Sequence, residues 1–281
     1  MSELNGFYEN MDFESYCAVP ALNGSSLVHM RRSPLYYKFM LDNPQPPSPA
    51  MILGTATHRL ILEPDRVGDF AVWGEQEGEN VRRGKVWDAF KDDNASKMIV
   101  TKAERDAMVG MAASARMNLP IRKYADAKGR CEVSMFWTDP VSGRRYKGRV
   151  DKLCDGHTIF DLKTARSCEK HAFCTQSFKL GYHIKMAFYW CGYRAITGKE
   201  PKIRLGVVES KKPHESATYR ITPDVLAMGL EEWQNLERTL DECERTNNWP
   251  AAEQEETDLQ LPTWATTDSN EDFAMEGLEI E

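Results

Sequence analysis

Two acids and a lysine on neighbouring predicted strands are the residues best placed to do chemistry. Asp151 closes the run Gly-Arg-Val-Asp, and Asp161 and Lys163 follow in the run Asp-Leu-Lys. Residues two apart on a strand point to the same face, so Asp161 and Lys163 project together while Leu162 turns into the core. Antiparallel pairing across the intervening turn brings Asp151 beside Asp161.

This arrangement indicates metal-dependent hydrolysis. Two adjacent carboxylates repel each other unless a cation lies between them, and hard oxygen ligands select Mg²⁺, with Mn²⁺ as a substitute. A lysine beside the cation orients or deprotonates a water, or stabilises developing negative charge. A lone Asp-x-Lys also fits a solvated strand. Apolar Val150, Ile159 and Phe160 favour the buried alternative, where a charge without a role is costly.

The elements that carry these residues are predicted to be strands joined by tight turns. Alternating residues indicate strands at 131–137, 145–153 and 158–163, with turns at 139–143 and 155–156, which together form an antiparallel meander. The downstream elements are helices at 169–178 and 182–196, strands at 202–209 and 215–221, and a helix at 223–244. The order of elements predicts an α/β domain.

A mainly helical part precedes this core. Residues 1–20 are expected to be irregular, and helices are predicted around 27–31 and at 35–41, 50–62 and 101–116, with a mixed stretch before residue 100. We therefore predict one domain over 1–266, with an N-terminal helical elaboration at about 20–120 and a core at about 128–222.

Charge is unevenly distributed along the chain. The net charge is −7, but ten acids and no Lys or Arg fall in residues 251–281, leaving 36 basic against 33 acidic residues in the first 250. The acidic total therefore does not exclude a nucleic-acid partner. Residues 267–281 are expected to be a disordered acidic tail, because they contain few apolar residues.

Cysteine usage and hydropathy exclude several classes of protein. None of the seven cysteines forms a CxxC pair, which argues against a zinc ribbon or an iron–sulfur cluster. No apolar run approaches the length of a membrane span, and the N-terminus does not resemble a secretory signal. We expect a soluble cytoplasmic protein with reduced cysteines and no membrane partner.

The ordered set of motifs resembles the PD-(D/E)xK nuclease superfamily, and within it the RecB-like nucleases. Gly54 to His58 is similar to their GxxxH motif, and Glu132 matches their acid on the first core strand. Residues 182–189 resemble the helix that follows their core. The patterns at 20–25, 33–34, 249–250 and 261–265 are similar to those of RecE-type (exonuclease VIII) nuclease domains, so the resemblance covers about residues 16–266.

The resemblance implies a small mixed β-sheet flanked by helices and a set of site residues. His58, Asp151 and Asp161 would bind metal, with the Leu162 carbonyl as a further ligand. Glu132 would bind metal directly or through water. Lys163, acting with the three acids as the catalytic set, would position the attacking water.

The resemblance also implies an activity. The implied activity is Mg²⁺-dependent degradation of linear double-stranded DNA from the 5′ end, which leaves a 3′ single strand. The enzyme would be a homo-oligomer, and its partner would be a single-strand annealing protein of RecT type. Two alternatives stay open on the same fold, a non-catalytic DNA-binding module and a structure-specific endonuclease.

The helix after the core departs from the family pattern at one position. The family has Gln where this chain has Lys185, while Tyr189 is in register. Gln both donates and accepts hydrogen bonds, whereas Lys only donates, so Lys185 is predicted to contact a DNA phosphate. We assign Lys185, Tyr189, Arg149 and Lys147 to DNA binding, the last two because a basic stretch lies beside the predicted site.

Overall fold

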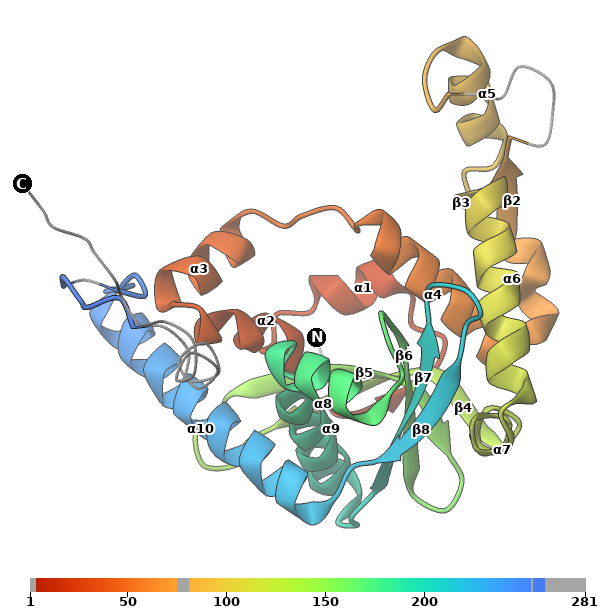
Figure 1. Cartoon of the computed structure of the whole chain (residues 1–281). Helices are drawn as coiled ribbons and strands as arrows, with labels where there is room; N and C mark the ends of the chain where they lie inside the picture. Colours follow the sequence, from red (N-terminus) through yellow and green to blue (C-terminus); the bar gives the residue numbers. More distant parts are fainter. Residues whose placement is uncertain (1–3, 75–80, 254, 261–281) are drawn as a thin grey trace, which may run out of the picture.

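A six-stranded mixed sheet forms the centre of the molecule in the computed structural model, which describes residues 4–74, 81–253 and 255–260 (Figure 1). Its order is β1-β4-β5-β6-β7-β8. The strands are β1 (Gly6–Tyr8), β4 (Gly129–Thr138), β5 (Arg145–Cys154), β6 (Thr158–Ala165), β7 (Lys202–Glu209) and β8 (Ser216–Arg220). Within this sheet, as far as the described residues show, the β6–β7 pair is parallel and the other pairs are antiparallel. The predicted α/β class and mixed sheet are confirmed.

One face of the sheet packs against the helices that follow the core strands. These are α8 (Lys170–Lys179), α9 (Tyr182–Thr197) and α10 (Pro223–Thr246), joined by α2 (Gly24–Leu27), the 3₁₀ helix η1 (Val28–Arg31) and α3 (Pro34–Asp42). Aromatic side chains fill this core: the ring of Phe188 lies 4.8 Å from Trp137 and 5.0 Å from Trp233. Such rings bury a large apolar area, which fixes α9 and α10 on the sheet.

The other face is covered by helices from the N-terminal part. They are α4 (Pro49–Leu62), α6 (Lys102–Met117) and α7 (Leu119–Ala125), which pack over Phe160 and Leu162 of β6. Ser48 caps α4 by accepting the N–H of Met51, and Pro49 occupies the first turn, where its missing N–H costs nothing. These caps fix where α4 begins relative to the sheet.

A projecting arm interrupts the helical part. It consists of β2 (Phe70–Trp73), β3 (Met98–Thr101) and α5 (Lys85–Asp93), preceded by the 3₁₀ helix η2 (Pro64–Asp69), and it extends away from the main sheet (Figure 1). The two strands pair in parallel, and Trp73, Trp87 and Phe90 pack together. The sequence predicted only a mixed stretch here, because each strand is too short to show a period.

The main error of the sequence prediction lies at the N-terminus. Residues 1–20 are not irregular throughout: β1 pairs with β4, and α1 (Phe13–Ala18) begins after Asp12, which accepts the N–H of Ser15. Helix α7 was also not predicted. The other predicted helices and strands are present, with ends that differ by a few residues.

The described residues also bear on the expectations for the cysteines and for membrane-spanning helices. All seven cysteines lie among them, and none is in a disulfide. Of the helices in the described part of the chain, none is both long and apolar enough to cross a bilayer. The motif at 261–265 and the acidic tail at 267–281 lie outside the described residues.

Candidate active site

Strand β6 presents an acid and a lysine on one face, as its alternation predicts. Leu162 is fully buried beneath α4 and α6, while Asp161 and Lys163 point toward α9. The Lys163 ammonium donates to the Asp161 carboxylate, and to the Leu162 carbonyl at 3.0 Å. The Asp161 side chain is only 2% exposed. Its negative charge is therefore held within the protein by a neighbouring cation.

Asp151 lies opposite Asp161, where the pairing of β5 and β6 ends. The last ladder pair before the acids is Lys152 with Phe160, which confirms the predicted antiparallel register. Beyond it, the Asp151 carboxylate accepts the backbone N–H of Leu162 at 2.6 Å. A carboxylate oxygen thus occupies the position of a strand carbonyl, and this contact holds Asp151 in the gap between the two strands.

Helix α4 brings His58 to the same point. The His58 Nδ1 atom lies 3.3 Å from an Asp151 carboxylate oxygen. Gly54, one turn earlier, allows this approach, because a Cβ there would lie only 3.2 Å from the Thr164 hydroxyl of β6. The spacing from Gly54 to His58 therefore has a physical reason: the glycine lets the helix close on the strand, and the histidine on the same helix face reaches the acid.

Glu132 sits at a break in the alternation of β4. Its φ is 51°, a left-handed conformation that costs a residue with a Cβ about 1–3 kcal/mol. Val133 packs in the core beneath α9, whereas Cys131 packs beneath α4, so the strand turns its side chains over at this position. Glu132 pairs with Arg149 Nε at 2.9 Å and is 41% exposed. It lies at the level of Asp151 on the neighbouring strand.

Helix α9 borders the acids with Tyr182 and Lys185. The Lys163 ammonium lies 5.2 Å from the centre of the Tyr182 ring, a cation–π contact. The side chain of Lys185, three residues later on the same helix face, has no hydrogen bond or ion pair to any described residue. Sequence reasoning missed Tyr182. Its signal was the spacing of three residues from Lys185, which places both side chains over one patch of the sheet.

Burial and neighbouring charges shift the pKa values of the acids, the histidine and the lysine at this site. Burial and then Asp161 raise the pKa of Asp151, although His58 and Lys163 oppose the shift. Burial and then Asp151 raise the pKa of Glu132. Burial, with Lys163 acting in the same direction, lowers the pKa of both His58 and Lys185. Crowded carboxylates raise one another's pKa, and a divalent cation bound between them would relieve this repulsion.

The donor set fits a hard divalent cation. His58, Asp151 and Asp161 supply one imidazole and two carboxylates, and Glu132 adds a third carboxylate nearby. The Nε2 atom of His58 is buried without a hydrogen-bond partner among the described residues. A neutral imidazole with an unused lone pair is a suitable ligand. The structure places His58 against Asp151, and holds Asp161 against Lys163 on the neighbouring strand.

The basic stretch of β5 does not form the predicted DNA surface. Lys147 has a relative exposure of 6%, and its ammonium donates to the carbonyl oxygens of Tyr16, Cys17 and Val19 at 3.0, 2.8 and 2.7 Å. All its donors are used, so its assignment to DNA binding is wrong. The cause is α1, which ends over this face of β5.

Arg149 and Tyr189 are also engaged inside the protein. Arg149 pairs with Glu132 and donates to the Met11 carbonyl at 2.8 Å. The buried Tyr189 donates its hydroxyl to the Arg149 carbonyl at 2.8 Å. We therefore correct both assignments from DNA contacts to residues that support the position of Glu132. Of the four predicted DNA contacts, Lys185 keeps an unpaired charge among the described residues.

Replacing Lys147 should reduce stability and leave DNA binding unchanged. Lys147→Met removes three hydrogen bonds from the end of α1, and we expect a loss of about 1–3 kcal/mol in the free energy of unfolding, measured by urea titration. Arg145→Gln is the control, because the Arg145 side chain has no partner among the described residues and should leave stability unaltered. A reduced salt dependence of DNA binding in Lys147→Met would restore the original assignment.

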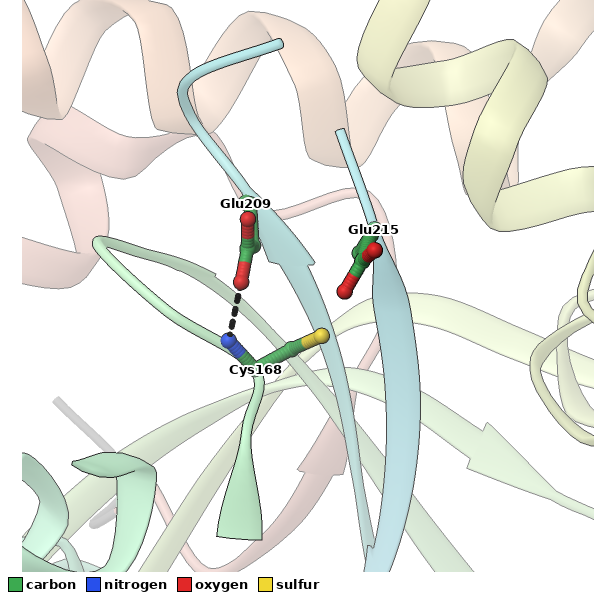
Figure 2. A group of neighbouring side chains, drawn as sticks. All are labelled: Cys168, Glu209 and Glu215. Carbon is green, nitrogen blue, oxygen red and sulfur yellow. Dashed lines mark hydrogen bonds between the residues drawn. The ribbon is translucent and has the colours of Figure 1, made fainter. Parts of the chain in front are cut away.

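A second group of possible ligands lies beyond the ends of β6 and β7. Figure 2 shows Cys168, Glu209 and Glu215, each with a ligand atom within 4.8 Å of the other two. Glu209 accepts the Cys168 backbone N–H at 2.7 Å, which fixes the loop between β6 and α8. Burial and then the two carboxylates raise the pKa of the Cys168 thiol to about 11. The thiol therefore stays protonated.

Comparisons with known proteins agree with this architecture. Residues 24–259 match the model of a family described as "PDDEXK-like domain of unknown function (DUF3799)". No curated protein matches the sequence with significance. A crystal structure of a "Putative exonuclease" from Eubacterium rectale has a TM-score of 0.61 and 16% identity, covering 93% of this chain and 100% of that chain, which shows a shared fold. The structure of SSO0001 has a TM-score of 0.28 at 16% identity, covering 50% of this chain and 66% of that one.

Proposed function

The chain belongs to the PDDEXK-like domain family DUF3799, and from this membership we propose that it is a divalent-metal-dependent exodeoxyribonuclease. The observation that supports the proposal is the convergence of His58, Asp151, Asp161 and Lys163 from three separate elements. We further propose RecE-type activity: degradation of linear duplex DNA from the 5′ end with Mg²⁺, leaving a 3′ single strand for an annealing protein of RecT type. The active form would be a homo-oligomer.

Each residue of the site has a distinct part in phosphodiester hydrolysis. His58, Asp151 and Asp161 would hold the metal ion, with Glu132 and the Leu162 carbonyl as further ligands. The bound ion would supply Lewis-acid activation of the phosphate and lower the pKa of a water. Lys163, which donates at the Asp161 carboxylate, would donate there to the attacking water or to a phosphate oxygen and so stabilise the negative charge of the transition state. Tyr182 would keep Lys163 in place.

The proposal is tested by digestion of DNA with and without metal. We expect linear duplex DNA labelled at its 5′ end to release mononucleotides in Mg²⁺, while EDTA stops the reaction and added Mg²⁺ restores it. Closed circular duplex should remain intact, since an exonuclease needs an end. Cleavage of the circle would instead support an endonuclease. Binding of linear duplex without cleavage in either Mg²⁺ or Mn²⁺ would support a non-catalytic module.

Lys185 is proposed to contact a DNA phosphate beside the site. Lys185→Gln should keep the cleavage rate at saturating DNA, because no ligand is lost, but weaken duplex binding modestly and reduce the salt slope by about one counterion. Lys202→Gln is the matched control, because Lys202 is exposed at the opposite end of the neighbouring strand β7. Lower turnover with unchanged DNA affinity would place Lys185 in the chemistry instead.

A further inference from the structure

A pocket of about 440 Å³ opens between η1 and α3 on one side and the end of α8 on the other. Tyr36 and Phe178 supply aromatic rings, and His29, Arg32 and Lys179 supply basic groups. This volume lies within the range of sites that take small molecules or single nucleotides. The residues combine flat apolar surfaces with positive charge.

The Phe178 ring is an exposed platform held in a fixed position. It is 53% exposed, and it stacks on the His183 ring with centroids 5.1 Å apart and planes at 15°. The His183 Nε2 atom lies 2.6 Å from the Glu232 carboxylate. Arg31 pairs with the same carboxylate at 2.7 Å and donates to the Phe178 carbonyl at 2.7 Å. An apolar ring kept rigid at the surface is preorganised for a stacking partner.

The charge of the pocket is left uncompensated at its mouth. Arg31 is neutralised by Glu232. The Arg32 guanidinium lies over the Tyr36 ring at 4.2 Å, and the His29 ring meets the same ring edge-on at 5.6 Å. Within the described part of the chain, neither Arg32 nor Lys179 has an ion-pair partner for its side chain. The pocket therefore favours an anionic ligand that also has a flat face.

The corner between α8 and α9 links the pocket to the candidate active site along the chain. Lys179 lines the pocket, and Tyr182, three residues along the chain, contacts Lys163. Between them, Gly181 has a φ of 67° and packs so closely on Val28 that a Cβ would come within 2.9 Å of that side chain. Residues 179–182 thus border the pocket at one end and Lys163 at the other.

We propose that this pocket binds unpaired bases of the DNA strand that runs to or from the active site; this rests on the proposed nuclease function. Stacking on Phe178 and Tyr36 requires a free base face, which a single strand offers and a duplex hides. Arg32 and Lys179 contact the phosphates between those bases. The pocket therefore selects single-stranded over double-stranded DNA.

The test measures binding without hydrolysis. Fluorescence anisotropy in EDTA, with a labelled oligothymidylate of about 10 nucleotides, should show that Phe178→Ala and Tyr36→Ala each weaken binding roughly 5- to 100-fold. Phe39→Ala is the matched control, because Phe39 lies on α3 with the same 53% exposure but outside the pocket. Phe178→Trp, which keeps an aromatic face, should retain affinity and so separates stacking from folding.

Charge variants give an independent measurement. Lys179→Ala should reduce the salt slope of oligothymidylate binding by about one counterion, whereas Lys170→Ala, at the other end of α8, should not. Equal affinity of Phe178→Ala, Tyr36→Ala and Phe39→Ala would overturn the pocket while leaving the hydrolysis of DNA untouched. If the pocket variants weakened oligothymidylate binding but the unsubstituted protein cleaved no DNA, the proposed function would be wrong and the assignment of the pocket as a single-strand binding site would remain.

Discussion

Asp161→Asn should reduce the cleavage rate of linear duplex DNA by at least about 1,000-fold, because it removes a metal ligand from the centre of the site. The substitution keeps an oxygen that can accept from Lys163, so the buried ammonium keeps a partner. For this reason Asn is a better probe than Ala, which would leave Lys163 with a lost acceptor. The rate is measured with end-labelled duplex in Mg²⁺, and binding of the same duplex in EDTA should change by less than about twofold.

The control for Asp161→Asn separates the two possible metal-binding groups. Glu215→Gln changes an exposed acid of the Cys168 group and should leave cleavage unaltered. Calorimetric titration with Mn²⁺ should show that Asp161→Asn loses binding and that Glu215→Gln retains it. If Asp161→Asn cleaved DNA at the rate of the unsubstituted protein, the assignment of the site would be wrong.

Lys163→Gln should lower the cleavage rate by roughly 100- to 1,000-fold, the usual effect of losing one donor to a developing charge. Its metal affinity should be retained or increased, since a cation that now pairs with Asp161 is removed. This combination of slow turnover with intact metal binding distinguishes Lys163 from the acids. The two quantities are measured on one preparation, by end-labelled cleavage in Mg²⁺ and by calorimetric titration with Mn²⁺.

Lys202→Gln again provides a matched lysine outside the site. It should change neither quantity, because Lys202 lies at the far end of β7. Loss of Mn²⁺ binding in Lys163→Gln, with the fold intact by circular dichroism, would show that Lys163 organises the acids and does not act on water or phosphate. A cleavage rate equal to that of Lys202→Gln would exclude Lys163 from the reaction.

Local patterns in the sequence were enough to bring Asp151, Asp161 and Lys163 together, whereas His58 and Glu132 came from the family resemblance. The alternation of β6 sets Asp161 and Lys163 on one face, and the short turn before it fixes the register that brings Asp151 beside them. The spacing of Gly54 and His58 depends only on the helix repeat. These relations act over one helix turn or one hairpin, so residue type and spacing already contain them.

Contacts distant in sequence decided the surroundings of the site. Lys147 and Arg149 were predicted to reach DNA, but residues in and around α1 accept their N–H groups: Lys147 donates to the Tyr16 carbonyl, and Arg149 donates to the Met11 carbonyl just before the helix. That helix has six residues and shows no readable period. The sequence also did not predict the left-handed backbone of Glu132, at which the side chains of β4 change faces of the sheet. Neighbouring strands and helices hold that backbone in place.

The sequence by itself therefore determined the α/β class, most of the elements and the pairing that sets Asp151 beside Asp161 and Lys163. Only the tertiary structure decided which cations stay unpaired, such as Lys185, and that the Phe178 ring stays exposed. A charge is available to a ligand only when no distant segment neutralises it. Whether a charge is neutralised depends on contacts between segments far apart in sequence, such as the hydrogen bond from Lys147 to the Tyr16 carbonyl. A local sequence pattern does not predict such contacts.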